Sequence, residues 1–103
     1  MMRIINGKRY NTDTAERLAS WQNMEDSSNF RYENYGVYRT EKGAFFLCYI
    51  GGPMSSRGRK EGNEYHADAG IQPVTPDEAR VHLERCGMNG AAAIEKYFPV
   101  EDA

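Results

Sequence analysis

Long hydrophobic runs are missing from this chain of 103 residues. No segment approaches the roughly 18 consecutive apolar residues that a membrane-spanning helix needs, and the opening residues, MMRIING, lack the apolar core of a secretory signal peptide. Cysteine is also scarce, with only Cys48 and Cys86 present. Small secreted domains usually carry a denser set of disulfides. These absences predict a cytoplasmic protein with two free thiols.

The motifs of common catalytic sites are absent as well. Ser55 and Ser56 lack the G-x-S-x-G elbow of serine hydrolases. The segment from Gly52 to Lys60 mixes glycine, hydroxyl and guanidinium groups, as anion-binding loops do, but departs from the spacing of a P-loop. Cys48 lies in an apolar run, which disfavours a reactive thiolate. We therefore predict a protein that is not an enzyme and that uses no cofactor.

Metal ligands are few and scattered. His82 and Cys86 lie four residues apart in a predicted helix, a spacing that zinc accepts. The chain has no C-x₂-C pair, and the other two ligands, Cys48 and His66, would come from a buried strand and a loop. We predict no metal site and interpret both cysteines as small core residues.

Excess positive charge is also lacking, because the net charge is −2. This balance disfavours a general affinity for nucleic acid, which depends on neutralising phosphates. The charge is uneven along the chain: residues 65–103 carry three basic and seven acidic groups. The length suffices for one domain with a single core.

An aromatic and apolar stretch from Tyr32 to Gly52 predicts the centre of the fold. Its residues favour β-strands, and Glu41-Lys42-Gly43 supplies a turn between two of them. The second strand alternates between two apolar faces, one formed by Phe45, Leu47 and Tyr49 and the other by Phe46, Cys48 and Ile50. Such a strand is expected to be covered on both sides.

The N-terminal region predicts a hairpin and then a helix. Asn6-Gly7 between short strands over 3–10 is a type I′ turn signal, and the short basic second arm suits a sheet edge. Asp13 with Glu16 resembles a capping box, and an i, i+3, i+4 stripe from Ala15 predicts a helix ending by Asn23. Residues 24–29 are expected to form a polar turn.

The C-terminal half predicts a loop, a strand and two helices. Residues 53–70 lack periodicity and predict a mobile loop. Residues 71–74 predict a short strand that Pro73 restricts to an edge. Thr75 and Glu78 predict a helix start with a capping box, Gly87 suits the position after its end, and a second helix is expected from Gly90 to Phe98.

Together these elements predict a single α+β domain over residues 1–103. Its small antiparallel sheet would have about three to five strands, with an N-terminal helix and a C-terminal helix pair packed on it. Aromatic and arginine side chains dominate the energetics of protein interfaces. The candidate partner-binding residues are therefore Arg57, Arg59, Lys60, Tyr32, Tyr35, Tyr38, Tyr49 and Tyr65. An alternative is a small nucleic-acid-binding module that uses the basic loop 57–60, with Tyr65 stacking a base.

Three segments carry a resemblance to known proteins: INGKRYNTDTA over 5–15, VYRTEKGAFFL over 37–47 and PVTPDEAR over 73–80. They resemble short proteins carried by phages and by integrative or conjugative elements of bacteria. The shared residues are turns, caps and strand residues, so the resemblance transfers no catalytic residue. It implies a setting in which small acidic proteins occupy a host protein's surface, as anti-CRISPR and other anti-defence inhibitors do.

We therefore hypothesise a non-enzymatic protein-binding protein that inhibits a bacterial immune complex and is encoded on mobile DNA. The expected partner is a host protein or a nucleoprotein complex. If that partner binds nucleic acid, the acidic C-terminal part could occupy its phosphate-facing groove by charge complementarity. Pairing of two copies through an exposed strand edge is a further alternative.

Overall fold

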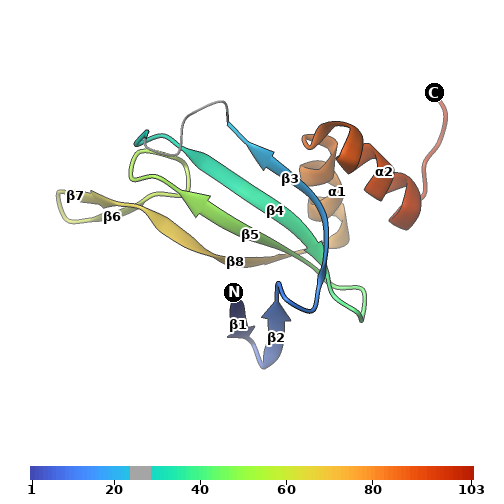
Figure 1. Cartoon of the computed structure of the whole chain (residues 1–103), viewed down its shortest axis with the longest axis horizontal. Helices are drawn as coiled ribbons and strands as arrows, with labels where there is room; N and C mark the ends of the chain where they lie inside the picture. The colour runs from blue at the N-terminus through green and yellow to red at the C-terminus, as the bar shows by residue number, and fades with distance from the viewer. Residues whose placement is uncertain (24–28) are drawn as a thin grey trace.

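The computed structural model describes residues 1–23 and 29–103 and combines antiparallel sheets with two C-terminal helices (Figure 1). The predicted polar turn at 24–29 lies almost entirely outside the described residues. The elements are β1 (Met2–Ile5), β2 (Lys8–Asn11), β3 (Glu16–Gln22), β4 (Glu33–Arg39), β5 (Phe45–Gly51), β6 (Arg59–Glu61), β7 (Glu64–His66), β8 (Asp68–Val74), α1 (Pro76–Glu84) and α2 (Gly87–Tyr97).

The central sheet has the strand order β3-β4-β5-β8, and each neighbouring pair is antiparallel. β4 and β5 form the predicted hairpin, with Val37 opposite Leu47. Gly43 closes its turn at a φ of +88°, a conformation that glycine adopts without a steric cost. The α+β class and the antiparallel sheet are therefore confirmed.

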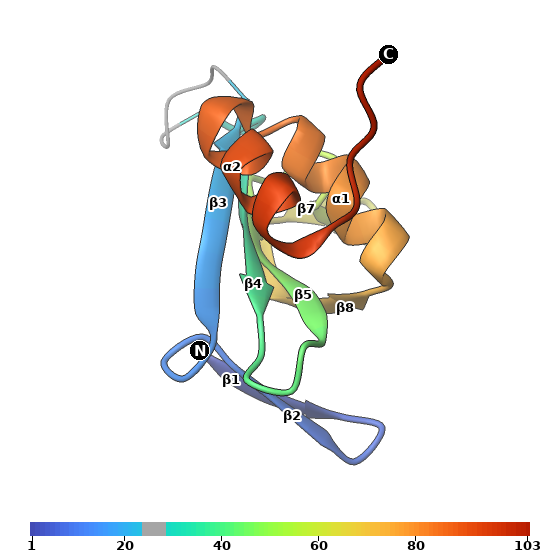
Figure 2. The same ribbon diagram turned by 90° about the vertical axis from the view of Figure 1, so that its right-hand side faces the viewer.

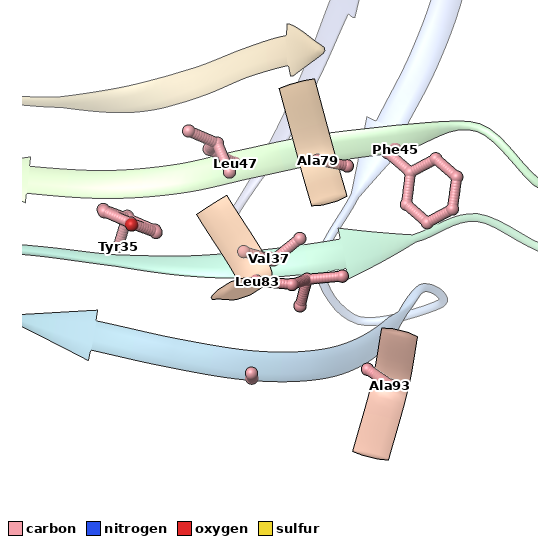
Figure 3. Packing of buried hydrophobic residues seen from close by; sticks show 8 residues of the cluster. Tyr35, Val37, Phe45, Leu47, Ala79, Leu83 and Ala93 are labelled. Carbon is pink, nitrogen blue, oxygen red and sulfur yellow. The ribbon is translucent and has the colours of Figure 1, made fainter. Parts of the chain in front are cut away.

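The two helices cover one face of this sheet at one end, while the β6–β7 hairpin projects at the opposite end (Figures 1 and 2). Val37 and Leu47 of the sheet face Leu83 and Ala79 of α1 in the core between the layers (Figure 3). These four side chains have no exposed surface. Full burial of a Val or Leu side chain contributes about 1.5–3 kcal/mol, so this contact fixes α1 on the sheet.

The β1–β2 hairpin packs on the other face of the sheet. Its Asn6-Gly7 turn has the two positive φ angles, 52° and 75°, that the type I′ prediction requires. Tyr10 of β2 meets Phe46 of β5 edge to face, with ring centroids 5.5 Å apart. The hairpin forms a two-stranded sheet of its own and does not extend the central sheet, so its predicted place at a sheet edge was wrong.

The expected N-terminal helix was also wrong, because residues 16–22 form strand β3. Asp13 does not cap a helix: its N–H bonds to Oδ1 of Asn11, which makes a local turn. A bulge at Leu18 shifts the register, and Ala19 and Trp21 then face the helices. The stripe that suggested a helix fits a bulged strand equally well, and pairing with β4 overrides the local helix propensity.

The C-terminal helix pair is confirmed. Thr75 and Glu78 form the predicted capping box at the start of α1. Gly87 adopts a φ of +66° at the junction, but α2 begins there and not at Gly90. Neither helix is long and apolar enough to cross a membrane, and these are the helices of the described residues.

The segment 53–70, predicted as a mobile loop, contains the β6–β7 hairpin and the first residues of β8. Its mobility stays a prediction. β8 is longer than expected, since it begins at Asp68, and Pro73 lies on an edge strand as predicted.

Candidate protein-binding surface

Three aromatic residues lie side by side across the sheet, on the face that carries the helices. Trp21 of β3 is paired with Tyr35 of β4, and Tyr35 with Tyr49 of β5. The Trp21 and Tyr35 rings stack at 5.3 Å between centroids. Arg85, at the end of α1, places its guanidinium 4.3 Å from the centre of the Trp21 ring, and Arg57 lies 4.6 Å above Tyr49. Two cations therefore cap this aromatic row.

Tyr35 is the buried centre of the row, and half-buried His82 of α1 packs against it. The imidazole of His82 meets the Tyr35 ring edge-on at 5.0 Å. Burial raises the pKa of the Tyr35 phenol. Burial also lowers the pKa of His82, and the positive charges of Arg57 and Arg85 act in the same direction. The Tyr35 hydroxyl and His82 Nδ1 have no hydrogen-bond partner among the described residues.

Cys86 lies next to this cluster and is not prepared as a nucleophile. Its thiol donates a hydrogen bond to the carbonyl oxygen of His82 at 3.2 Å, and burial raises the thiol pKa. A raised pKa lowers the thiolate fraction at neutral pH, and the thiolate is the reactive form. Cys86 is therefore a packing residue of this face.

The opposite face of the sheet is open beyond the β1–β2 hairpin. A hollow of about 310 Å³ runs across β3, β4 and β5. Its walls include the side chains that alternate away from the helices, namely Arg17, Ser20, Gln22, Asn34, Tyr38, Cys48 and Ile50. β5 was predicted to be covered on both sides. At Phe46, which has no exposed surface, this is so, but Ile50 farther along the strand is not covered. We call this surface the open face.

The open face has an apolar part and one charged side chain. Ile50 is 49 % exposed although it lies on an interior strand, and Cys48 is half-buried beside it. Tyr38 stacks on Phe46 at 5.1 Å, and burial raises the pKa of its phenol, so the hydroxyl stays protonated at neutral pH. Among the described lining residues, Arg17 is the one charged side chain. A surface of this kind suits a partly apolar ligand that carries little charge.

The predicted tyrosines are divided between the two faces. Tyr38 lines the open face. Tyr32 is half-buried next to this face, and its hydroxyl accepts a hydrogen bond at 2.6 Å from Nδ2 of Asn34, which also lines the face. Tyr35 is 2 % exposed and belongs to the core, so it offers no surface to a partner. Tyr49 lies under Arg57 in the aromatic row.

The predicted basic loop is engaged in local contacts. Arg57 donates to Oε1 of Gln72 at 2.5 Å in addition to covering Tyr49. Arg59 pairs with Glu61 at 3.3 Å, and Lys60 lies 5.6 Å from the ring centre of half-exposed Tyr65. The three basic side chains of the loop therefore already have partners within the protein, and acidic groups lie beside them. Both features disfavour the loop as a nucleic-acid-binding surface.

The four potential metal ligands lie at three separate places in the fold. Cys48 is on the open face, His66 on β7, and His82 with Cys86 around the end of α1. Within residues 1–23 and 29–103, no three His, Cys, Asp or Glu side chains are grouped as metal ligands.

Sequence reasoning missed the residues that β3 contributes to the open face. Arg17, Ser20 and Gln22 were placed on the expected helix. The alternation of apolar and polar residues from Ala19 to Gln22 is the signal that could have identified a strand.

Comparison with protein-family models, with curated proteins and with solved structures found no match to this chain.

Proposed function

We propose that this protein is a non-enzymatic binding protein whose open face docks on another protein. The observation that carries the proposal is the exposure of Ile50, an apolar residue near the end of the interior strand β5. Apolar side chains at such positions are normally covered, and an uncovered apolar centre rimmed by polar groups is typical of interaction surfaces.

The chemistry of the open face selects the kind of partner. Ile50 and Cys48 offer an apolar patch on β5, Ser20 and Gln22 offer neutral hydrogen-bonding groups, and Arg17 offers a single cation. A nucleic acid would need several cations for its phosphates. The matching occupant is a protein surface with apolar side chains at its centre and a carboxylate that pairs with Arg17.

The test compares proteins retained by the wild type and by two variants. Ile50→Glu places a charge on the apolar part of the open face, while Met88→Glu changes a residue of α2 that is 90 % exposed. We expect wild type and Met88→Glu to retain the same host protein, and Ile50→Glu to lose it with its far-ultraviolet circular dichroism unchanged. The retained protein is then purified and its affinity measured by calorimetry.

Two outcomes would contradict this proposal. One is that the wild type retains no host protein at low micromolar concentration. The other is that Ile50→Glu binds the purified partner as tightly as Met88→Glu does, which would place the contact elsewhere.

A narrower form of the proposal names the partner as a component of a bacterial immune complex. It rests on the resemblance of segments 5–15, 37–47 and 73–80 to proteins of phages and mobile elements. In cells whose CRISPR interference is active against a test phage, expression of the protein should restore plaque formation, and Ile50→Glu should not. Unchanged plaque counts with the wild type would remove the narrower form and leave the binding proposal standing.

A further inference from the structure

A second hollow, of about 600 Å³, lies between strand β2 and the turn that joins β4 to β5. One wall is β2 itself, with Lys8, Arg9 and Asn11, and the other includes Thr40, Lys42 and Ala44. No residue of β1 lines it, so the hollow lies along the edge of β2 that points away from β1. We call it the basic groove. It shares no lining residue with the open face.

The register of the hairpin shows which backbone groups face the basic groove. In a hairpin with a two-residue turn, the residues that flank the turn exchange hydrogen bonds, and the next pair does not. Ile5 and Lys8 flank the turn, so Arg9, opposite Ile4, turns its N–H and C=O away from β1. The bond from the Thr12 N–H to the Met1 carbonyl, at 3.0 Å, fits this alternation.

A strand edge with free N–H and C=O groups is a template for another strand. Arg9 is exposed, and within the described residues its backbone makes no hydrogen bond outside the β1–β2 ladder. Asn11 also turns its backbone away from β1, but its carbonyl already accepts the N–H groups of Thr14 and Ala15, at 3.3 and 3.0 Å, so the free pairing groups are centred on Arg9. The edge therefore offers pairing for a short extended peptide.

The charge of the basic groove selects the composition of that peptide. Lys8, Arg9 and Lys42 line it, against the single acid Glu41. None of these four takes part in an ion pair within residues 1–23 and 29–103. The lining thus carries three positive charges and one negative charge in a protein whose net charge is −2. Local complementarity favours an anionic partner.

We propose that the basic groove binds an extended acidic segment of another protein, which adds to β2 as a third strand of the β1–β2 sheet. Its carboxylates lie on one face of the added strand and contact Lys8 and Lys42, and its backbone pairs with the N–H and C=O of Arg9. A phosphate group fits this edge less well, because it accepts hydrogen bonds but cannot donate one to the Arg9 carbonyl. The open face is not required for this interaction.

The first test uses synthetic peptides as probes. An acetylated and amidated Glu-Val-Glu-Val-Glu-Val is titrated into the full chain and followed by amide resonances. We expect the largest shifts at Arg9 and Asn11 and no binding of the matched Lys-Val repeat. Two N-methylated versions separate pairing from charge: methylation of the amides that face β2 should abolish binding, and methylation of the alternate amides should preserve it.

The second test uses protein variants. Lys8→Glu combined with Lys42→Glu should weaken peptide binding by about fivefold or more, since two attractive charge pairs become repulsive while each exposed pair is individually weak. Lys60→Glu on the outlying hairpin is the matched control and should bind as the wild type does. Ile50→Glu should also bind normally, which separates this proposal from the open face.

Three results would overturn the proposal. They are no binding of the acidic peptide at low salt, equal loss of binding with both methylated peptides, and tighter binding of a single-stranded RNA hexamer than of the acidic peptide.

Discussion

Gly90 sets how closely the two helices approach each other. A Cβ atom at this position would lie 1.9 Å from the carbonyl oxygen of Leu83 and 2.9 Å from Cβ of Cys86. The carbonyl belongs to the backbone of α1, so it cannot rotate away as a flexible side chain would. Helix propensity alone would favour alanine here by about 1 kcal/mol, but sterics oppose it.

We predict that Gly90→Ala destabilises the protein by about 2 kcal/mol, because overpacking forces the backbone to shift. Asn89→Ala, at the neighbouring exposed position, should have no effect or a slightly stabilising one. Urea unfolding of both variants checks the prediction. A stabilised Gly90→Ala variant would show that the helices move apart freely.

His82 makes stability depend on pH. Its pKa is lowered first by burial and then by Arg57 and Arg85, while Glu78 acts in the opposite direction. As the pH falls below about 6.5, the unfolded chain protonates His82 and the folded chain does not until a lower pH. The unfolded state then binds more protons, so the free energy of unfolding should fall between about pH 7 and pH 5.

The variant His82→Gln cannot titrate and should show a flatter profile over the same range. Asn63→Gln, at an exposed position of the outlying hairpin, changes no titrating group and should keep the wild-type slope. Urea unfolding at a series of pH values measures the difference between them. If His82→Gln keeps the full slope, another group causes it.

At the scale of elements, sequence motifs predicted the element ends whose hydrogen bonds join residues close together in the sequence. The start of α1 was predicted because its cap is built from neighbouring residues: the N–H of Glu78 donates to Oγ1 of Thr75 at 3.1 Å, and the N–H of Thr75 donates to Oε1 of Glu78 at 2.9 Å. β3 was mistaken for a helix because its conformation depends on β4, which is distant in the sequence. The early start of α2 likewise depends on packing against α1.

Removal of the cap should weaken α1. Thr75→Ala leaves the Glu78 N–H without its acceptor and should cost about 1 kcal/mol of stability, while Thr75→Ser keeps the hydroxyl and should cost less. Thermal unfolding followed by circular dichroism compares the two. Equal losses would show that the hydroxyl bond contributes nothing.

The whole molecule is built on one sheet with unequal cover on its two faces. The alternation in β5 predicted both apolar faces, but the sequence could not show how far the β1–β2 hairpin reaches along the second one. The open face and the basic groove both exist because the β1–β2 hairpin covers only part of the second face of the sheet. Neither follows from a local motif, because each collects residues from separate elements.

Phe46 and Ile50 test this unequal cover, since they lie on the same face of the same strand. Phe46 has no exposed surface, and Ile50 is 49 % exposed. Phe46→Ala should cost about 3–5 kcal/mol, whereas Ile50→Ala should cost less than about 1 kcal/mol because little apolar area leaves contact. Urea unfolding of both variants measures these two changes in the free energy of unfolding. Similar losses of stability would mean that the open face is covered in solution.

The outlying β6–β7 hairpin makes the molecule easy to engineer. It leaves the sheet after β5 and returns as β8, its neighbour in the sheet, and its tip at Gly62 has no atom within 4 Å of an added Cβ. A fluorescent reporter or an affinity tag grafted between Gly62 and Asn63 would therefore be carried far from the helices (Figure 1). Such a fusion would let both binding proposals be followed in living cells with the two ends of the chain left native.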